Sequence, residues 1–166
     1  KQAGESWSKM KNIIVVDRSI IPSCDVSLNE LGKIVTQTYD LEKVGGYKIG
    51  STFIGEGCNN AVDIIRRYTI EKQIIFDGQK WGTDIPDTAE KILGEIKKAG
   101  VDAVILYPFG GPETQKVWTE TGFGLGLEVL IGGEMTHKGV RRDEGGYFTD
   151  EDFIQMYSIG VAQGVT

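Results

Sequence analysis

The chain has 166 residues, a formal net charge of −6 and 40% hydrophobic residues. This length and composition predict one domain with a core of its own and leave little room for two domains. The acidic balance argues against a general binder of nucleic acid or of anionic membranes. No apolar run is long enough to cross a bilayer, so we expect a cytoplasmic protein in which Cys24 and Cys58 are reduced thiols.

Apolar runs alternate with helix-like stretches along the chain. Residues 1–12 resemble a flexible lead-in, and Ile13–Val16 is a short strand or a lid at the base of the sheet. Ser27 and Glu30 have the spacing of a capping box at a helix start. We predict strands at Ser19–Cys24, Gly45–Ile49, Gln73–Phe76, Val101–Tyr107 and Leu127–Ile131. We predict helices from Ser27, from Asn59 or Asn60, over Asp87–Ala99, over Glu113–Thr121, and from Thr149 or Asp150 to Ala162.

This repeated strand–helix order has a direct consequence for the fold class. Short connections between the elements predict right-handed crossovers and a parallel sheet, which is an α/β fold. A doubly wound open sheet and a β/α barrel both fit the order of elements. No G-x-G-x-x-G motif follows the first predicted strand, and this argues against a dinucleotide-binding sheet.

Ionisable side chains follow several of the predicted strands. Asp25 ends the first strand, Lys48 lies near the end of the second, and Asp77 ends the third, with Lys80 and Asp84 just beyond. The carboxyl ends of parallel strands share one rim, where α/β proteins place their chemistry. Lysines and carboxylates that alternate there keep one another charged and can act on a substrate without a metal. Glu134, Thr136 and the single histidine, His137, follow the fifth strand.

These residues lie in motifs that resemble a known family. The run DGQKWGTDIPDT, together with GGYKIG around Lys48 and GGEMTHKG downstream, resembles the orotidine 5'-monophosphate decarboxylases, and most closely an archaeal-type branch. The resemblance extends from about Ser19 to the C-terminus. It implies a TIM barrel without cofactor or metal, and a homodimer with its active sites at the interface. The implied substrate is orotidine 5'-phosphate, converted to UMP in pyrimidine biosynthesis, with no nucleic-acid or membrane partner.

The resemblance also implies roles for individual residues. Lys48, Asp77 and Lys80 would form the charged network of one subunit, and Asp84 would complete it in the partner subunit. Lys80 would stabilise the carbanion formed at C6 of the pyrimidine and then protonate it, while Asp77 would sit near the departing carboxylate. Asp25 would hold the ribose hydroxyls. The other implied substrate-binding residues are Ile85 and Thr88, from the neighbouring subunit, and Met135 and Thr136.

The chain departs from the family in spacing and in length. The commonest family spacing, Asp-x-Lys-x-x-Asp, is here Asp-x-x-Lys-x-x-x-Asp. Residues three apart on a straight strand face opposite sides, so a bulge or the start of the loop must re-aim Lys80. A complete barrel of this kind needs roughly 200 residues or more. We therefore expect a single partial barrel domain over residues 1–166, without the family's phosphate-gripping loops, and little or no decarboxylase activity from this chain alone.

Two alternatives stay open beside the decarboxylase. A magnesium-dependent sugar-phosphate decarboxylase or synthase of the same superfamily uses a similar Asp/Lys strand. The DIPDT motif argues against it, and loss of activity on chelation would argue for it. The second alternative is an inactive barrel fragment that acts as an assembly module. Binding of a nucleotide such as UMP by the chain would discriminate between this module and an enzyme.

Overall fold

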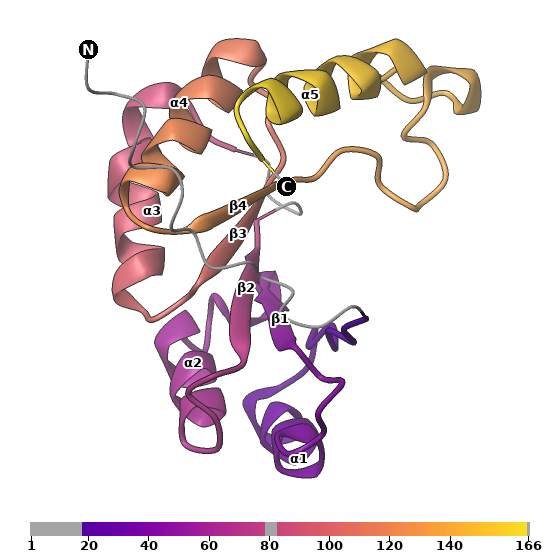
Figure 1. The fold of residues 1–166 in the computed structure, drawn as a ribbon. Coiled ribbons are helices and arrows are strands. Elements are labelled where there is room, and N and C mark those ends of the chain that lie inside the picture. The colour runs from indigo at the N-terminus through magenta and orange to yellow at the C-terminus, as the bar shows by residue number, and fades with distance from the viewer. Residues whose placement is uncertain (1–17, 79–82, 166) are drawn as a thin grey trace.

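The computed structural model describes residues 18–78 and 83–165 of the chain (Figure 1). These residues contain a parallel four-stranded sheet in which each strand pairs with the next, in the order β1-β2-β3-β4. A doubly wound sheet reverses its strand order, whereas a barrel adds its strands in sequence. The observed order therefore favours barrel winding and confirms the predicted α/β class. The strands are β1 Gly46–Gly50, β2 Gln73–Asp77, β3 Ala103–Leu106 and β4 Glu128–Ile131.

Helices alternate with the strands, the first helix lies before β1 in the chain, and the first four helices cover one face of the sheet. The helices are α1 Leu28–Thr38, α2 Cys58–Arg66, α3 Ala89–Lys98, α4 Pro112–Gly124 and α5 Asp150–Ala162. Short 3-10 turns lie at Ser51–Phe53, Pro86–Thr88 and Arg142–Glu144. Figure 1 shows α1 and α2 at the β1 end of the sheet, α3 and α4 beside β3 and β4, and α5 beyond β4.

Alternate residues of each strand point to opposite faces. One set packs with α1 to α4 in the main core, as Tyr47, Ile74 and Val104 do, each at most 1% exposed. The other set defines the face away from these helices, which we call the inner face. Its small apolar cluster centres on Ile75 and Ala103. Besides these two, the inner face carries Gly46, Lys48, Gly50, Gln73, Asp77, Ile105, Glu128 and Leu130.

The predicted first strand, Ser19–Cys24, is wrong as a regular strand. This segment lies parallel to β1, and the Lys48 N–H donates to the Pro22 carbonyl over 2.9 Å, but the segment forms only isolated bridges. Pro22 has no N–H to donate, so it interrupts the ladder that would make a strand. The segment still occupies the position next to β1 and places Asp25 near the carboxyl ends of the strands. The two bridges join Ile20 to Val44 and Ser23 to Lys48.

The helix starts test the predicted caps. Ser27 caps α1 in the predicted capping box with Glu30. The predicted start of the last helix at Thr149 or Asp150 is confirmed, and Thr149 also forms a capping box with Asp152. The predicted cap of α2 at Asn59 or Asn60 is wrong, because α2 starts at Cys58 after Gly57, whose φ is 88° and which gives no side-chain cap. A left-handed φ of this kind favours glycine.

Two other helix bounds differ from the prediction. The stretch predicted as a helix from Asp87 begins with the 3-10 turn Pro86–Thr88, and α3 proper begins at Ala89. The α4 helix is longer at both ends than the predicted Glu113–Thr121. The predicted lead-in at residues 1–12 and the predicted strand or lid at Ile13–Val16 lie outside the described residues.

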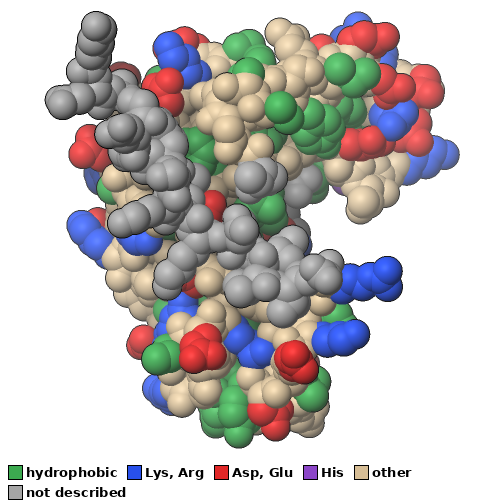
Figure 2. Space-filling view, viewed as in Figure 1, with side chains coloured by type: hydrophobic (Ala, Val, Ile, Leu, Met, Phe, Trp, Pro, Cys, Tyr) green, Lys and Arg blue, Asp and Glu red, His purple; other side chains and the backbone are tan. Residues whose placement is uncertain are grey.

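The surface of the described residues is uneven in charge and in polarity. Figure 2 shows acidic side chains gathered around the start of α5 and the loop before it, where five carboxylates lie between Asp143 and Asp152. Ile154, Tyr157 and Val161 of α5 are exposed. Within the described ranges, no helix is both long enough and apolar enough to span a membrane.

Candidate active site

A lysine and an aspartate from neighbouring strands meet on the inner face. The Lys48 Nζ lies 2.7 Å from the Asp77 Oδ2. The parallel register pairs Gly50 with Asp77 and Lys48 with Ile75, so the two charged side chains lie diagonally on one face. The Asp77 side chain is 4% exposed and the Lys48 side chain 27%. An ammonium in an otherwise apolar strand needs such a carboxylate partner, as the sequence led us to expect.

A glycine makes room for a second carboxylate beside this pair. A Cβ on Gly50 would lie 3.3 Å from both the Asp77 Cβ and the Asp77 carbonyl oxygen, and 3.8 Å from the Asp25 Oδ1. Asp25 is exposed, and its Oδ2 accepts a hydrogen bond from the Ser23 hydroxyl at 3.2 Å. Asp25, Lys48 and Asp77 therefore gather at the carboxyl end of β1 and β2. We call these three residues the charged cluster.

Cys24 lies next to the charged cluster without serving as a nucleophile. It is fully buried, and its thiol donates to the Pro22 carbonyl with a 3.6 Å separation. Burial, reinforced by the negative charge of Asp25 and partly offset by Lys48, raises the pKa of the Cys24 thiol to about 11. Because the thiolate is the reactive form, this cysteine is inert near neutral pH and contributes to packing.

The predicted partner-side residues lie on the segment between β2 and α3. Asp84 is exposed, and its Oδ1 accepts the Ile85 N–H at 2.8 Å. Ile85 is 59% exposed, and the Thr88 hydroxyl donates to the Ile85 carbonyl over 2.9 Å. Among the residues that the structure describes, no hydrogen bond or ion pair joins Asp84 to Lys48. Lys80, the predicted proton donor, lies outside the described residues, as does Trp81.

The segment after β4 is held by a clamp that the sequence analysis missed. The Arg141 guanidinium donates from Nε and one terminal nitrogen to the two carboxylate oxygens of Glu134, at 2.5 and 2.8 Å. Its other terminal nitrogen lies 2.8 Å from the Asp150 Oδ1 at the start of α5. The Glu134 N–H donates to the Tyr157 hydroxyl at 3.2 Å. We call Glu134, Arg141, Asp150 and Tyr157 the rim clamp.

The rim clamp positions the predicted substrate-binding residues Met135 and Thr136. Met135 is half-buried and packs against the cluster of Tyr107, Val140 and Phe153, whereas Thr136 is exposed. His137 is exposed as well and forms no hydrogen bond among the described residues. The clamp escaped prediction because Arg141 lies in a charged run, and nothing in that run marks the residue that reaches back to Glu134.

The rim clamp gives a testable pH dependence. The hydrogen bonds from Arg141 lower the pKa of the Glu134 carboxyl. A lowered folded-state pKa stabilises the clamp above the ordinary carboxyl pKa of about 4.3, and this contribution is lost as the pH falls through the lowered value. We expect the amide hydrogens of residues 134–137 to exchange with solvent a few-fold faster in Glu134→Gln than in wild type at pH 7. This difference should vanish in acid. Glu95→Gln, which breaks an exposed ion pair with Lys98 on α3, is the control and leaves these amides unchanged. Equal amide exchange in Glu134→Gln and wild type at pH 7 would mean that the Glu134–Arg141 hydrogen bonds do not hold this segment.

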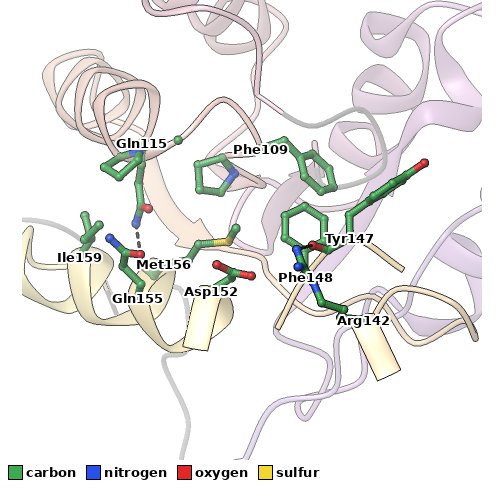
Figure 3. A pocket seen from close by; sticks show the side chains of 12 residues that line it. Phe109, Gln115, Arg142, Tyr147, Phe148, Asp152, Gln155, Met156 and Ile159 are labelled. Atoms are coloured by element: carbon green, nitrogen blue, oxygen red, sulfur yellow. Dashed lines mark hydrogen bonds between the residues drawn. The ribbon is translucent and has the colours of Figure 1, made fainter. Parts of the chain in front are cut away.

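A pocket of about 290 Å³ lies away from the charged cluster, between the loop after β3 and the start of α5 (Figure 3). Figure 3 shows Phe109, Tyr147 and Phe148 on one side and Met156 on the other. The charged groups at the pocket already have partners, since Asp152 caps α5 and Arg142 donates to the Tyr147 carbonyl. None of the charged cluster lines this pocket. The charged cluster is therefore the better candidate for chemistry.

Comparisons with known proteins bear on this arrangement. No family model matches the chain. The orotidine 5'-phosphate decarboxylase of Methanosarcina mazei is 33% identical over 98 residues, which are 59% of this chain and 42% of that protein. The orotidine 5'-monophosphate decarboxylase structure from Methanocaldococcus jannaschii matches 89% of the chain with a TM-score of 0.73 and 23% identity. Over part of its length, the chain is similar in sequence to an orotidine 5'-phosphate decarboxylase.

Two other solved structures agree on the fold. The Methanocaldococcus jannaschii enzyme complexed with the inhibitor BMP gives a TM-score of 0.74 at 23% identity, with 89% of this chain and 64% of that chain covered. The enzyme from Lactobacillus acidophilus gives 0.70 at 20% identity, with 90% and 69% covered. The chain covers 68% of the first Methanocaldococcus jannaschii structure and 42% of the Methanosarcina mazei protein. The fold is therefore a TIM-barrel fold, present in part.

Proposed function

We propose that the chain supplies the charged part of an orotidine 5'-phosphate decarboxylase site, which releases CO2 from orotidine 5'-phosphate and leaves UMP. The observation that carries the proposal is the Lys48–Asp77 contact of 2.7 Å, with Asp77 buried at the carboxyl end of β2. Barrel enzymes place their reacting groups at this end of their strands. The sequence relationship to a protein named as this decarboxylase supports the same assignment.

The charged cluster suits a reaction that develops a carbanion. In the proposed reaction the bond between C6 and the carboxylate breaks, and the electron pair stays on C6 until a proton arrives. Asp77 would stand beside the departing carboxylate and hold the Lys48 ammonium in place, while Lys80 would deliver the proton. Fixed charges that need not reorganise during the reaction contribute several kcal/mol of stabilisation to such a transition state. Asp25 would bind the ribose hydroxyls from its exposed position.

We further propose that the site is shared between two copies of the chain. Asp84 and Ile85 are exposed. An exposed isoleucine beside an exposed carboxylate suits a contact with a symmetry-related copy, in which the same segment serves the opposite site. Thr88, Met135 and Thr136 would then line the pyrimidine pocket from the two sides.

The experiment that tests the proposal is a titration of the chain with UMP while its mass in solution is measured. We expect UMP to bind and the mass to be that of two chains. Release of CO2 from orotidine 5'-phosphate, measured in parallel, is expected to be slow for this chain alone. A folded chain that binds no UMP would overturn the enzyme assignment and favour the assembly module. Activity lost on chelation and restored by magnesium would instead favour the sugar-phosphate enzyme.

A further inference from the structure

A buried tryptophan on α4 holds the segment that carries Asp84 and Ile85. Trp118 is 4% exposed and belongs to the main core. Its indole Nε1–H donates to the Ile85 carbonyl at 3.1 Å. A buried indole N–H needs an acceptor, because leaving it unpaired costs desolvation free energy. The core of α4 therefore favours one position of the Ile85 backbone over others.

The Ile85 carbonyl accepts three hydrogen bonds. Besides Trp118, it accepts the Thr88 N–H at 3.2 Å and the Thr88 hydroxyl at 2.9 Å. The segment has a second anchor at Thr83, whose N–H donates to the Tyr107 carbonyl over 2.8 Å at the end of β3. Backbone contacts thus fix the segment at both ends.

These anchors use the backbone and leave two side chains directed outward. Asp84 and Ile85 are exposed while Thr83 and Ala89 on either side are buried. The Asp84 carboxylate accepts from the N–H of Ile85, the same residue whose carbonyl Trp118 holds. Displacing the Ile85 backbone would therefore move both outward side chains together.

We propose that Trp118 is a positioning residue for the Asp84–Thr88 segment: its indole N–H sets where Asp84 and Ile85 stand relative to the nucleotide they serve. The part of this inference that concerns the nucleotide rests on the proposed function. The part that concerns the segment stands on the hydrogen bonds alone. Trp118 touches no reacting group, so its effect on a ligand passes through Asp84 and Ile85.

Trp118→Phe tests the proposal, because phenylalanine keeps an aromatic ring in the core and removes the donor. A second variant carries 3-benzothienylalanine at position 118, which has the shape of tryptophan without the N–H. Losing one hydrogen bond of ordinary strength predicts about five-fold faster exchange of the Thr88 amide in both variants. UMP affinity is expected to fall by a similar factor. The control is Phe123→Leu, which removes aromatic volume from the same helix and leaves the Ile85 carbonyl bonded.

The readouts separate positioning from general destabilisation. Faster Thr88 exchange and weaker UMP binding in both Trp118 variants, with neither in Phe123→Leu, support the proposal. Unchanged exchange of the Thr88 amide in the benzothienyl variant overturns the proposal, whatever the affinity of that variant for UMP. Weaker binding in Phe123→Leu at the same loss of thermal stability also overturns it, because the effect would then be structural. If wild type binds no UMP, the proposed function fails while the exchange result still decides the role of Trp118.

Discussion

Replacing Lys48 with methionine is expected to destabilise the chain more than replacing Asp77 with asparagine. The two changes break the same 2.7 Å contact but leave different charges behind. Lys48→Met leaves a carboxylate whose side chain is 4% exposed, whereas Asp77→Asn leaves an ammonium that is 27% exposed. A buried ion that loses a partner costs up to several kcal/mol, and water can solvate the better exposed one. We expect a loss of about 3 kcal/mol for Lys48→Met and about 1 kcal/mol for Asp77→Asn.

The double variant Lys48→Met/Asp77→Asn separates two free energies: the cost of the buried charge that each single variant leaves behind, and the stabilisation from the Lys48–Asp77 contact itself. It leaves neither charge at the pair, so its stability should exceed that of Lys48→Met alone. Lys33→Met, at an exposed position on α1, is the control for loss of a lysine and should stay within about 0.5 kcal/mol of wild type. Urea unfolding curves give all four values. If Lys48→Met proves no less stable than Asp77→Asn, then burial of Asp77 does not govern the pair.

The same substitutions carry the largest expected effect on function. Under the proposed reaction, a preorganised charge at the reacting centre is worth about 10²-fold to 10³-fold in rate. UMP, the product, lacks the carboxylate, so its affinity should change less than the rate of CO2 release. Lys48→Met and Asp77→Asn are therefore both expected to bring the slow CO2 release of this chain below detection while UMP still binds to Asp77→Asn. If wild type releases CO2 at a measurable rate, the same rate in either variant would exclude the charged cluster as the reacting centre.

The elements that the sequence predicted well are those decided by neighbours along the chain. The capping box at Ser27 depends on residues three positions apart, and it forms. The predicted start of the last helix at Thr149 or Asp150 is also confirmed. The alternation of strands and helices depends on apolar periods within each segment, and the parallel sheet follows from it. The contact of Lys48 with Asp77 was also within reach, because a lysine in an apolar strand must find a carboxylate on the same rim.

Two features escaped prediction for different reasons. The bond from Trp118 to the Ile85 carbonyl spans 33 positions, and an apolar face predicts a buried indole without predicting its acceptor. In the Ser19–Cys24 segment an apolar run predicts a strand, yet Pro22 removes a donor and leaves isolated bridges.

Gly46→Ala is expected to be the most destabilising methyl addition in the sheet. A Cβ at Gly46 would lie 2.4 Å from the carbonyl oxygen of Gln73, its partner on β2. Backbone atoms cannot rotate away as side chains do, so β1 must shift relative to β2. Overpacking of this kind costs about 3 kcal/mol. The matched control is Gly94→Ala on α3, where a Cβ meets no atom within 4 Å and the helix gains about 0.5–1 kcal/mol.

The Gly46→Ala substitution is also expected to disturb the charged cluster, because Gly46 and Lys48 lie on the same strand. Gly46, Lys48 and Gly50 lie on the same face of this five-residue strand, so a shift that clears the Gln73 carbonyl also moves Lys48 relative to Asp77. Gly46→Ala should therefore lower both the urea midpoint and the affinity for UMP, while Gly94→Ala raises the midpoint and leaves the affinity unchanged. A Gly46→Ala protein with wild-type stability would mean that the two strands are not held at this separation. A destabilised variant with unchanged UMP affinity would mean that the Lys48–Asp77 contact tolerates the shift, and that its 2.7 Å geometry does not limit binding.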